Sequence, residues 1–164
     1  GKLLRNKIKN HPRYPYHLLR EEMQEFILDK LQLLIERKLI KGIGENGTEY
    51  TVIAQILDLP KEILRLIQKF DFTKKNPKLI YINTGETMIS LQDSILVTFL
   101  NLAGFDILFF VPTGYQSVEN YFAEKLMEEH QIGEYKYDMQ VPDLNNISTN
   151  STRPSWRRKL FRRG

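Results

Sequence analysis

The fold is decided by residues 79–117, which read LIYINTGETMISLQDSILVTFLNLAGFDILFFVPTGYQS. The first four residues are apolar and β-prone, which predicts a short buried strand. Ser90 is a suitable N-cap for a helix over Leu91–Ala103, and Gly104 suits the position just past that helix's end. Residues 106–111 predict a second buried strand. Together these elements have the form of a parallel β-α-β unit.

The residues that follow extend the same alternation. Ser117 can cap a helix over residues 118–131, and residues 134–139 predict a third strand. This spacing predicts an α/β fold, a Rossmann-like βαβαβ unit with a short parallel sheet over residues 78–141. Three strands are few for a doubly wound sheet. Either further strands precede residue 1 in a longer protein, or the sheet is small and self-sufficient beneath a helical cover.

Residues 1–72 predict a small helical unit of about three helices. The first runs from about Tyr16 to Ile40, where apolar residues recur at helical spacing. The second covers Tyr50–Leu57, and the third runs from Pro60 to about Phe70. Residues 42–47 match the G-x-G-x-x-G spacing of dinucleotide-binding loops. Because the match follows a helix rather than a strand, a helix-ending turn is the favoured interpretation.

Positive charge is concentrated at the C-terminal end. Residues 145–164 hold six of the 24 basic residues and no acidic one, so the remainder has 18 basic and 20 acidic residues. Residues 142–164 are predicted to be a linker and a basic amphipathic tail, in which Trp156, Leu160 and Phe161 lie among arginines and Lys159. As a helix this tail could contact an anionic membrane weakly, a partner groove or RNA. Its shortness favours a terminus that docks its tryptophan on the domain. No specific nucleic acid is expected, because the body is net negative.

The composition excludes several chemistries. There is no cysteine, so disulfides and thiolate metal sites are absent. The three histidines, His11, His17 and His130, make a zinc site improbable on composition alone. The longest apolar run, Ile107–Val111, is too short to cross a bilayer. A cytoplasmic protein is therefore expected.

The loops that follow the two predicted strands are the candidate site. In open parallel sheets ligands bind beyond the carboxyl ends of the strands, and each loop carries a Thr-Gly pair there. Glycine allows close backbone approach, while threonine hydroxyls and helix N–H groups can hold anions or sugar hydroxyls. The predicted ligand-binding residues are Thr84, Gly85, Glu86, Thr113, Gly114, Tyr115 and Gln116.

An equally simple interpretation is that both loops are ordinary strand-to-helix turns, which use the same residue types. No lysine follows either glycine, so neither loop is a Walker phosphate loop. The sequence implies no particular cofactor, although Mg²⁺ could accompany a phosphorylated ligand. No serine is convincingly paired with a histidine, so no catalytic residue is assigned and enzymatic activity stays open.

Several motifs resemble a known family. They are residues 81–87 (YINTGET), 102–106 (LAGFD) and 110–115 (FVPTGY), together with 11–16 (HPRYPY) and 153–157 (RPSWR). This set is similar to the C-terminal part of the Bacillus-type YceG-like family, which is unrelated to the lytic transglycosylase that shares the name.

The resemblance implies a role but no residues. Family members are described as components of a biosynthetic module, encoded near tellurite-resistance and general-stress proteins, and are much longer than this chain. It therefore implies a cytosolic stress-response protein of a Gram-positive bacterium. The expected partners are a small phosphorylated or nucleotide-like metabolite or, alternatively, proteins of the stress module contacted by a non-catalytic interaction domain.

Overall fold

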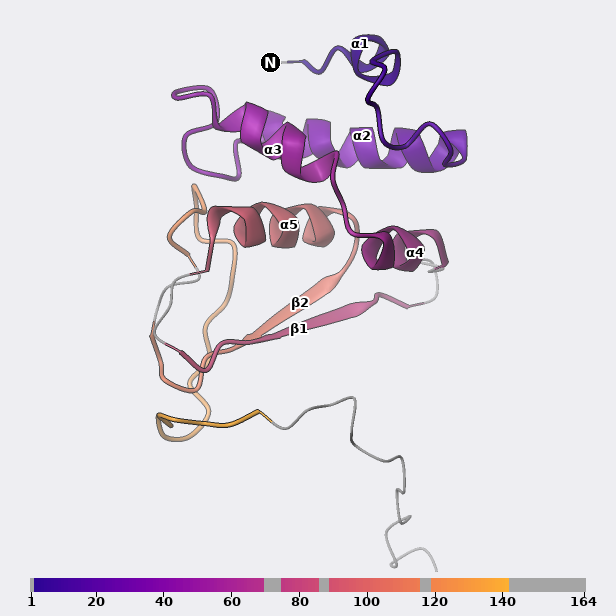
Figure 1. Cartoon of the computed structure of the whole chain (residues 1–164). Helices are drawn as coiled ribbons and strands as arrows, with labels where there is room; N and C mark the ends of the chain where they lie inside the picture. Colours follow the sequence, from indigo (N-terminus) through magenta and orange to yellow (C-terminus); the bar gives the residue numbers. More distant parts are fainter. Residues whose placement is uncertain (1, 70–74, 86–88, 116–118, 142–164) are drawn as a thin grey trace, which may run out of the picture.

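The computed structural model describes residues 2–69, 75–85, 89–115 and 119–141. The helices and a short sheet lie in layers (Figure 1). The helix α5 is the middle layer: the sheet lies on one side of it, and the helices α2 and α3 lie on the other side. The elements in chain order are α1 (Arg5–Lys9), α2 (Glu21–Glu36), α3 (Thr48–Ile56), α4 (Lys61–Lys69), β1 (Lys78–Ile82), α5 (Leu91–Leu102) and β2 (Asp106–Phe110).

The predicted β-α-β unit is present. β1 and β2 pair in parallel, with Lys78 opposite Asp106 at one end and Ile82 opposite Phe110 at the other. The Ser90 hydroxyl accepts a hydrogen bond from the Asp93 backbone N–H at 3.0 Å, which caps α5 as expected. The expected boundaries of the two strands and of α5 therefore agree with the structure to within one residue.

The end of α5 is a Schellman motif, a turn that satisfies the last carbonyls of a helix. Gly104 N–H donates to the Asn101 carbonyl at 2.9 Å, and Phe105 N–H donates to the Leu100 carbonyl at 3.0 Å. The motif needs a left-handed residue, and Gly104 has a φ of 100°. Phe105, the residue after this turn, is buried, and β2 begins at the next residue.

The βαβαβ prediction is wrong beyond β2, because residues 119–141 contain neither the expected helix nor the expected third strand. The backbone around Phe122 instead forms an antiparallel bridge with Ile40. Lys41 N–H donates to the Tyr121 carbonyl, and Ala123 N–H donates to the Leu39 carbonyl, each at 2.9 Å. Tertiary pairing and burial of Phe122 outweigh a local helix preference that is weak at this length.

The expected third strand also meets a backbone obstacle. Asp138 has a φ of 57°, which breaks an extended conformation near the end of residues 134–139. Tyr135 and Tyr137, which would point to one face of the expected strand, are more than half exposed and so are not buried against another element. The sheet in the described part of the chain therefore has two strands.

The N-terminal segment begins with a helix that was not expected. α1 lies within the basic, proline-containing stretch, and ion pairs connect it with α2. Arg5 contacts Asp29 at 2.6 Å, and Lys9 contacts Glu21 at 2.5 Å and also pairs with Glu25. These contacts raise the pKa values of Arg5 and Lys9 above their ordinary values through hydrogen bonds to the carboxylates. Ion pairs with α2, together with packing of the half-buried Ile8 against the hydrophobic cluster, thus position this short helix.

One hydrophobic cluster runs through the described elements. α5 lies at its centre, with Ile95, Phe99 and Leu100 fully buried between the sheet and the helices α2 and α3. Apolar residues of α2 fill the same core, as its amphipathic pattern predicts; they are Met23, Ile27, Leu28, Leu31, Leu34 and Ile35. The expected division into a helical unit (residues 1–72) and an α/β unit (78–141) stays a prediction. The linker and tail, residues 142–164, lie outside the described residues.

Candidate functional site

The two predicted loops leave the sheet at the same edge. Ile82 and Phe110, the last residues of β1 and β2, are partners in the register. Asn83 N–H donates to the Phe110 carbonyl at 2.9 Å and extends the pairing by one step. Parallel pairing therefore brings the Thr84–Gly85 loop and the 113–115 loop to one edge. Glu86 and Gln116, the other two predicted site residues, lie outside the described residues.

The first loop is held by its own side chains and leads to the start of α5. The Asn83 side-chain oxygen accepts from Gly85 N–H at 3.3 Å. Beyond the loop, the Ser90 hydroxyl lies 2.7 Å from an Asp93 carboxylate oxygen. Burial and the negative charge of Asp93 raise the pKa of Tyr81 on the neighbouring strand. A carboxylate therefore already takes part in the interactions at the positive end of the α5 dipole.

The second loop is packed more tightly. Thr113 is buried, and its hydroxyl accepts from Tyr115 N–H at 3.4 Å. Gly114 has a φ of 68°, and a Cβ added there would lie 2.2 Å from the Tyr135 ring. Lys136 N–H also donates to the Pro112 carbonyl at 2.8 Å. Gly114 thus makes room for a neighbouring tyrosine, which is a structural reason for glycine that the sequence alone did not reveal.

Among the described residues of the two loops, two side chains remain accessible to a ligand. Tyr115 is 46% exposed and offers a ring and a hydroxyl, and Thr84 is half-buried. The described residues contain no group of three histidine, aspartate or glutamate side chains that could hold a metal ion. His130 is exposed, 3.7 Å from Glu128, while His11 and His17 precede α2 in the chain. The described residues of this edge can therefore support hydrogen bonding and stacking, and among them no nucleophile lies beside a base.

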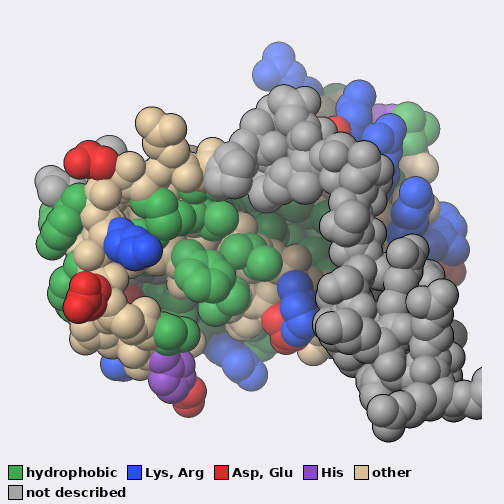
Figure 2. Space-filling view, turned by 90° about the horizontal axis from the view of Figure 1, so that it is seen from below, with side chains coloured by type: hydrophobic (Ala, Val, Ile, Leu, Met, Phe, Trp, Pro, Cys, Tyr) green, Lys and Arg blue, Asp and Glu red, His purple; other side chains and the backbone are tan. Residues whose placement is uncertain are grey.

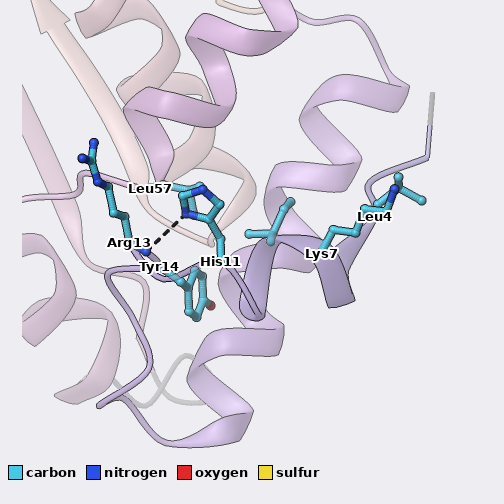
Figure 3. A pocket seen from close by; sticks show the side chains of 7 residues that line it. Leu4, Lys7, His11, Arg13, Tyr14 and Leu57 are labelled. Atoms are coloured by element: carbon cyan, nitrogen blue, oxygen red, sulfur yellow. Dashed lines mark hydrogen bonds between the residues drawn. The ribbon is translucent and has the colours of Figure 1, made fainter.

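A separate pocket of about 280 Å³ lies between α1 and the end of α3 (Figure 3). Its walls are largely apolar, with Leu4, Ile8 and Leu57 among them, and Lys7, His11, Arg13 and Tyr14 complete the lining. His11 Nδ1 accepts from Arg13 N–H at 3.2 Å, which holds a tight turn around Pro12. The histidine therefore has a local structural role.

The same proline-containing motif anchors the N-terminal segment in the core. Tyr16 is 2% exposed; its hydroxyl donates to the Ile56 carbonyl at 2.5 Å and accepts from Leu59 N–H at 3.0 Å. Burial raises the pKa of Tyr16 to about 12. Sequence reasoning missed this role, although two tyrosines spaced among prolines were visible as part of a motif.

The glycine-rich segment after α2 is a turn, as expected. Gly42, Gly44 and Gly47 all have positive φ values, and Gly47 precedes the first residue of α3. The Glu49 carboxylate accepts from Gly44 N–H at 3.1 Å, so this loop binds a carboxylate of its own chain. Hydrogen bonds from its own backbone N–H and from Gly44 N–H lower the pKa of Glu49.

Comparison with known proteins identifies the family. The family model of the YceG domain matches residues 1–152. The chain belongs to the YceG domain family. An uncharacterized protein YceG from Bacillus subtilis (strain 168) is 31% identical over 93 residues, which cover 55% of this chain and 17% of that protein. The match thus spans about a sixth of the relative's length.

The family assignment gives no residue roles by itself. No solved structure matches the chain. Among the described residues, no helix combines the length and hydrophobicity needed to span a bilayer. What the site does must therefore be argued from its own geometry.

Proposed function

We propose that this chain is the C-terminal part of a cytoplasmic YceG-type protein, within a tellurite-associated stress-response module with a biosynthetic role. Its own part in that module is to bind a small phosphorylated or nucleotide-like metabolite at the carboxyl edge of the sheet. The observation that carries the binding proposal is that Thr84–Gly85 and Thr113–Tyr115 leave neighbouring parallel strands at one edge. Crevices at such edges are the usual ligand sites of α/β sheets.

The exposed groups suggest a role for each side chain. The Tyr115 ring is accessible for stacking against a base or a sugar, and the Thr84 hydroxyl is available to a polar substituent. Asp93 contributes negative charge near the start of α5 and disfavours a bare phosphate. Binding of a phosphorylated ligand should therefore be stronger with Mg²⁺, which neutralises part of the phosphate charge.

A thermal-shift screen tests this site. Nucleotides, nucleotide sugars and sugar phosphates are added at millimolar concentration, with and without Mg²⁺. A ligand present at one hundred times its Kd should stabilise the chain by about 2.7 kcal/mol, or roughly 5–10 °C in Tm. Tyr115→Ala and Thr84→Ala should each remove that shift without lowering the Tm of the free protein.

The control is Tyr50→Ala, because Tyr50 is an exposed tyrosine on α3. It should leave the ligand shift unchanged. Gly114 is unsuitable for substitution, because Tyr135 occupies the space that a side chain would need. Equal ligand shifts in Tyr115→Ala and wild type would show that the metabolite binds elsewhere, and no shift with any compound would reject the site.

A second function is favoured by a different observation, the exposed apolar residues of the sheet. Ile80, Ile82, Leu108 and Phe110 are each 40–56% exposed. Parallel sheets are usually covered on both faces. A non-catalytic docking role for this face, within the same stress module, is therefore the alternative, whether the partner is a protein element or a membrane surface approached with the basic tail.

A further inference from the structure

One face of the β1–β2 sheet is apolar, and the described part of the chain leaves it about half exposed. Alternate residues point to opposite faces, and Leu79, Ile107 and Phe109 pack towards the hydrophobic cluster. The other face carries Ile80 beside Leu108 and Ile82 beside Phe110, because these pairs are register partners. Figure 2, which views the molecule from below, shows hydrophobic side chains gathered in the middle, with charged side chains around them.

The four side chains adjoin one another and form a patch on the order of a few hundred Å². Patches of this size on a soluble protein commonly mark an interaction site. The surface is named here the sheet face and consists of Ile80, Ile82, Leu108 and Phe110. Lys78 and Asp106, the first residues of β1 and β2, form an ion pair at 2.7 Å that borders the sheet face at the amino end of the strands.

We propose that residues 153–164 of the same chain cover the sheet face as a short amphipathic helix. This inference rests on the docking role of that face and not on the metabolite site. Trp156 and Leu160, four positions apart, lie on one side of such a helix, with Phe161 about 100° further round from Leu160, and Pro154 suits a first helical turn. These three large apolar side chains can contact the four exposed apolar side chains of the sheet face, while the long basic side chains between and around them extend their charged ends to water.

The described chain already returns to the sheet before the tail begins. Lys136 N–H donates to the Pro112 carbonyl at 2.8 Å, just after β2. In Figure 1 the last described residues, drawn in orange, lie on the side of the sheet away from α5. From Val141, residues 142–152 can span up to about 36–40 Å. A five-residue strand is only about 17 Å long, so the tail can reach any part of the sheet face.

The charge distribution favours a contact within the chain. The tail carries six positive charges, while the remainder of the protein has two more acidic than basic residues. Glu134 and Asp138 are exposed on the returning segment, where they can attract the basic margin of the helix. Because the tail is tethered, it competes with separate partners at a high effective concentration.

Trp156, the single tryptophan of the chain, reports on this contact directly. Its fluorescence emission and its quenching by acrylamide are measured in the full chain, in its urea-unfolded form, and in variants whose folding is verified by circular dichroism. The sheet-face variants are Leu108→Ser and Phe110→Ser, and the tail variant carries Leu160→Ser with Phe161→Ser. Leu18→Ser is the matched control, since Leu18 is 89% exposed and precedes α2.

If the tail covers the sheet face, wild-type emission is blue-shifted and quenching is several-fold weaker than in urea. Both sheet-face variants and the tail variant shift the emission towards the unfolded value, while Leu18→Ser does not. Emission of wild type at the unfolded position overturns the inference. So does a blue shift that the sheet-face variants leave unchanged, one that depends on protein concentration, or one that appears only with phosphatidylserine vesicles.

Binding of a hydrophobic dye distinguishes two hypotheses: that the tail occupies the sheet face, and that the sheet face docks a partner of any kind. With the tail in place, wild type binds little dye, and the tail variant binds several-fold more. If wild type already binds the dye strongly and Leu108→Ser reduces that binding, the sheet face still docks a partner, but the tail does not occupy it. If neither sheet-face substitution alters dye binding in wild type or in the tail variant, the docking role falls as well.

Discussion

At the scale of single residues, several residues that stand out in the sequence motifs have structural roles. Gly104 ends α5 in a left-handed conformation, and Gly114 accommodates the Tyr135 ring. Asp106 pairs with Lys78 at the amino end of the sheet, away from the candidate site. Tyr16 has the most demanding environment of these, because its hydroxyl makes two hydrogen bonds inside the core.

Tyr16→Phe should destabilise the protein by about 1–3 kcal/mol. The substitution leaves the Ile56 carbonyl and the Leu59 N–H without their hydroxyl partner in a buried place. The free energy of unfolding from urea titration measures the loss. Tyr50→Phe is the control, since Tyr50 is 73% exposed and should change stability by less than about 0.5 kcal/mol. Equal effects of the two substitutions would contradict the role of Tyr16.

The same residue should make the protein sensitive to alkali. The folded-state pKa of Tyr16 is about 12, above the ordinary value near 10, because burial disfavours the phenolate. Its contribution is therefore complete below pH 10 and is lost as the pH rises through the folded-state pKa, amounting to about 2–3 kcal/mol. Wild type should lose more stability than Tyr16→Phe between pH 9 and pH 12. Parallel curves for the two proteins would contradict this assignment.

At the scale of elements, α5 is the best-specified part of the chain. It begins with a serine cap and ends with a Schellman glycine. The residues between them are apolar enough to be buried against the helices α2 and α3 on one side and the sheet on the other. α1 is the opposite case, because it has no fully buried residue and is held by ion pairs with α2 and by the half-buried Ile8. Ion pairs of this exposed kind usually contribute less than about 1 kcal/mol each.

Gly104→Ala should destabilise the protein by about 1–2 kcal/mol. A φ of 100° at Gly104 is strained for any residue with a Cβ, and the turn it forms directs the chain into β2. Thermal unfolding measures the loss. Gly104→Asn should cost less, because asparagine tolerates left-handed conformations better than alanine. Wild-type stability of Gly104→Ala would show that the turn can adopt a right-handed form.

At the scale of the whole molecule, contacts distant in sequence decide how the last described segment runs. Phe122 is 4% exposed and lies beside Ile40, and Tyr135 covers Gly114. These contacts attach residues 119–136 to the helical layer at one place and to the loop after β2 at another. The sheet face is left partly exposed by the described residues.

Phe122→Ala should destabilise the protein by about 3–5 kcal/mol, the usual cost of emptying a buried phenylalanine site. It should also increase hydrogen exchange at Lys41 and Ala123, whose N–H groups pair across the bridge. Urea unfolding and amide exchange measure both effects. Ile132→Ala, at an 88% exposed position, is the control and should change stability by less than about 0.5 kcal/mol. A small effect at both positions would mean that the bridge does not hold this segment.

The amino-acid sequence by itself determined most of the local elements up to β2. α2, α3, α4, both strands and α5 follow from apolar periodicity, caps and glycine positions, because these signals act within a few residues. The parallel pairing of β1 and β2, and hence the shared edge for Thr84 and Thr113, also followed from the helix between them.

Only the tertiary structure decided the rest. The absence of a helix over residues 119–131 depends on pairing with Ile40, some 80 positions earlier, and no local pattern reports such a contact. The purpose of Gly114 depends on Tyr135, and the position of α1 depends on carboxylates of α2. Burial and charge pairing between distant segments outweigh weak local preferences, because a short helix or strand has little stability before it packs.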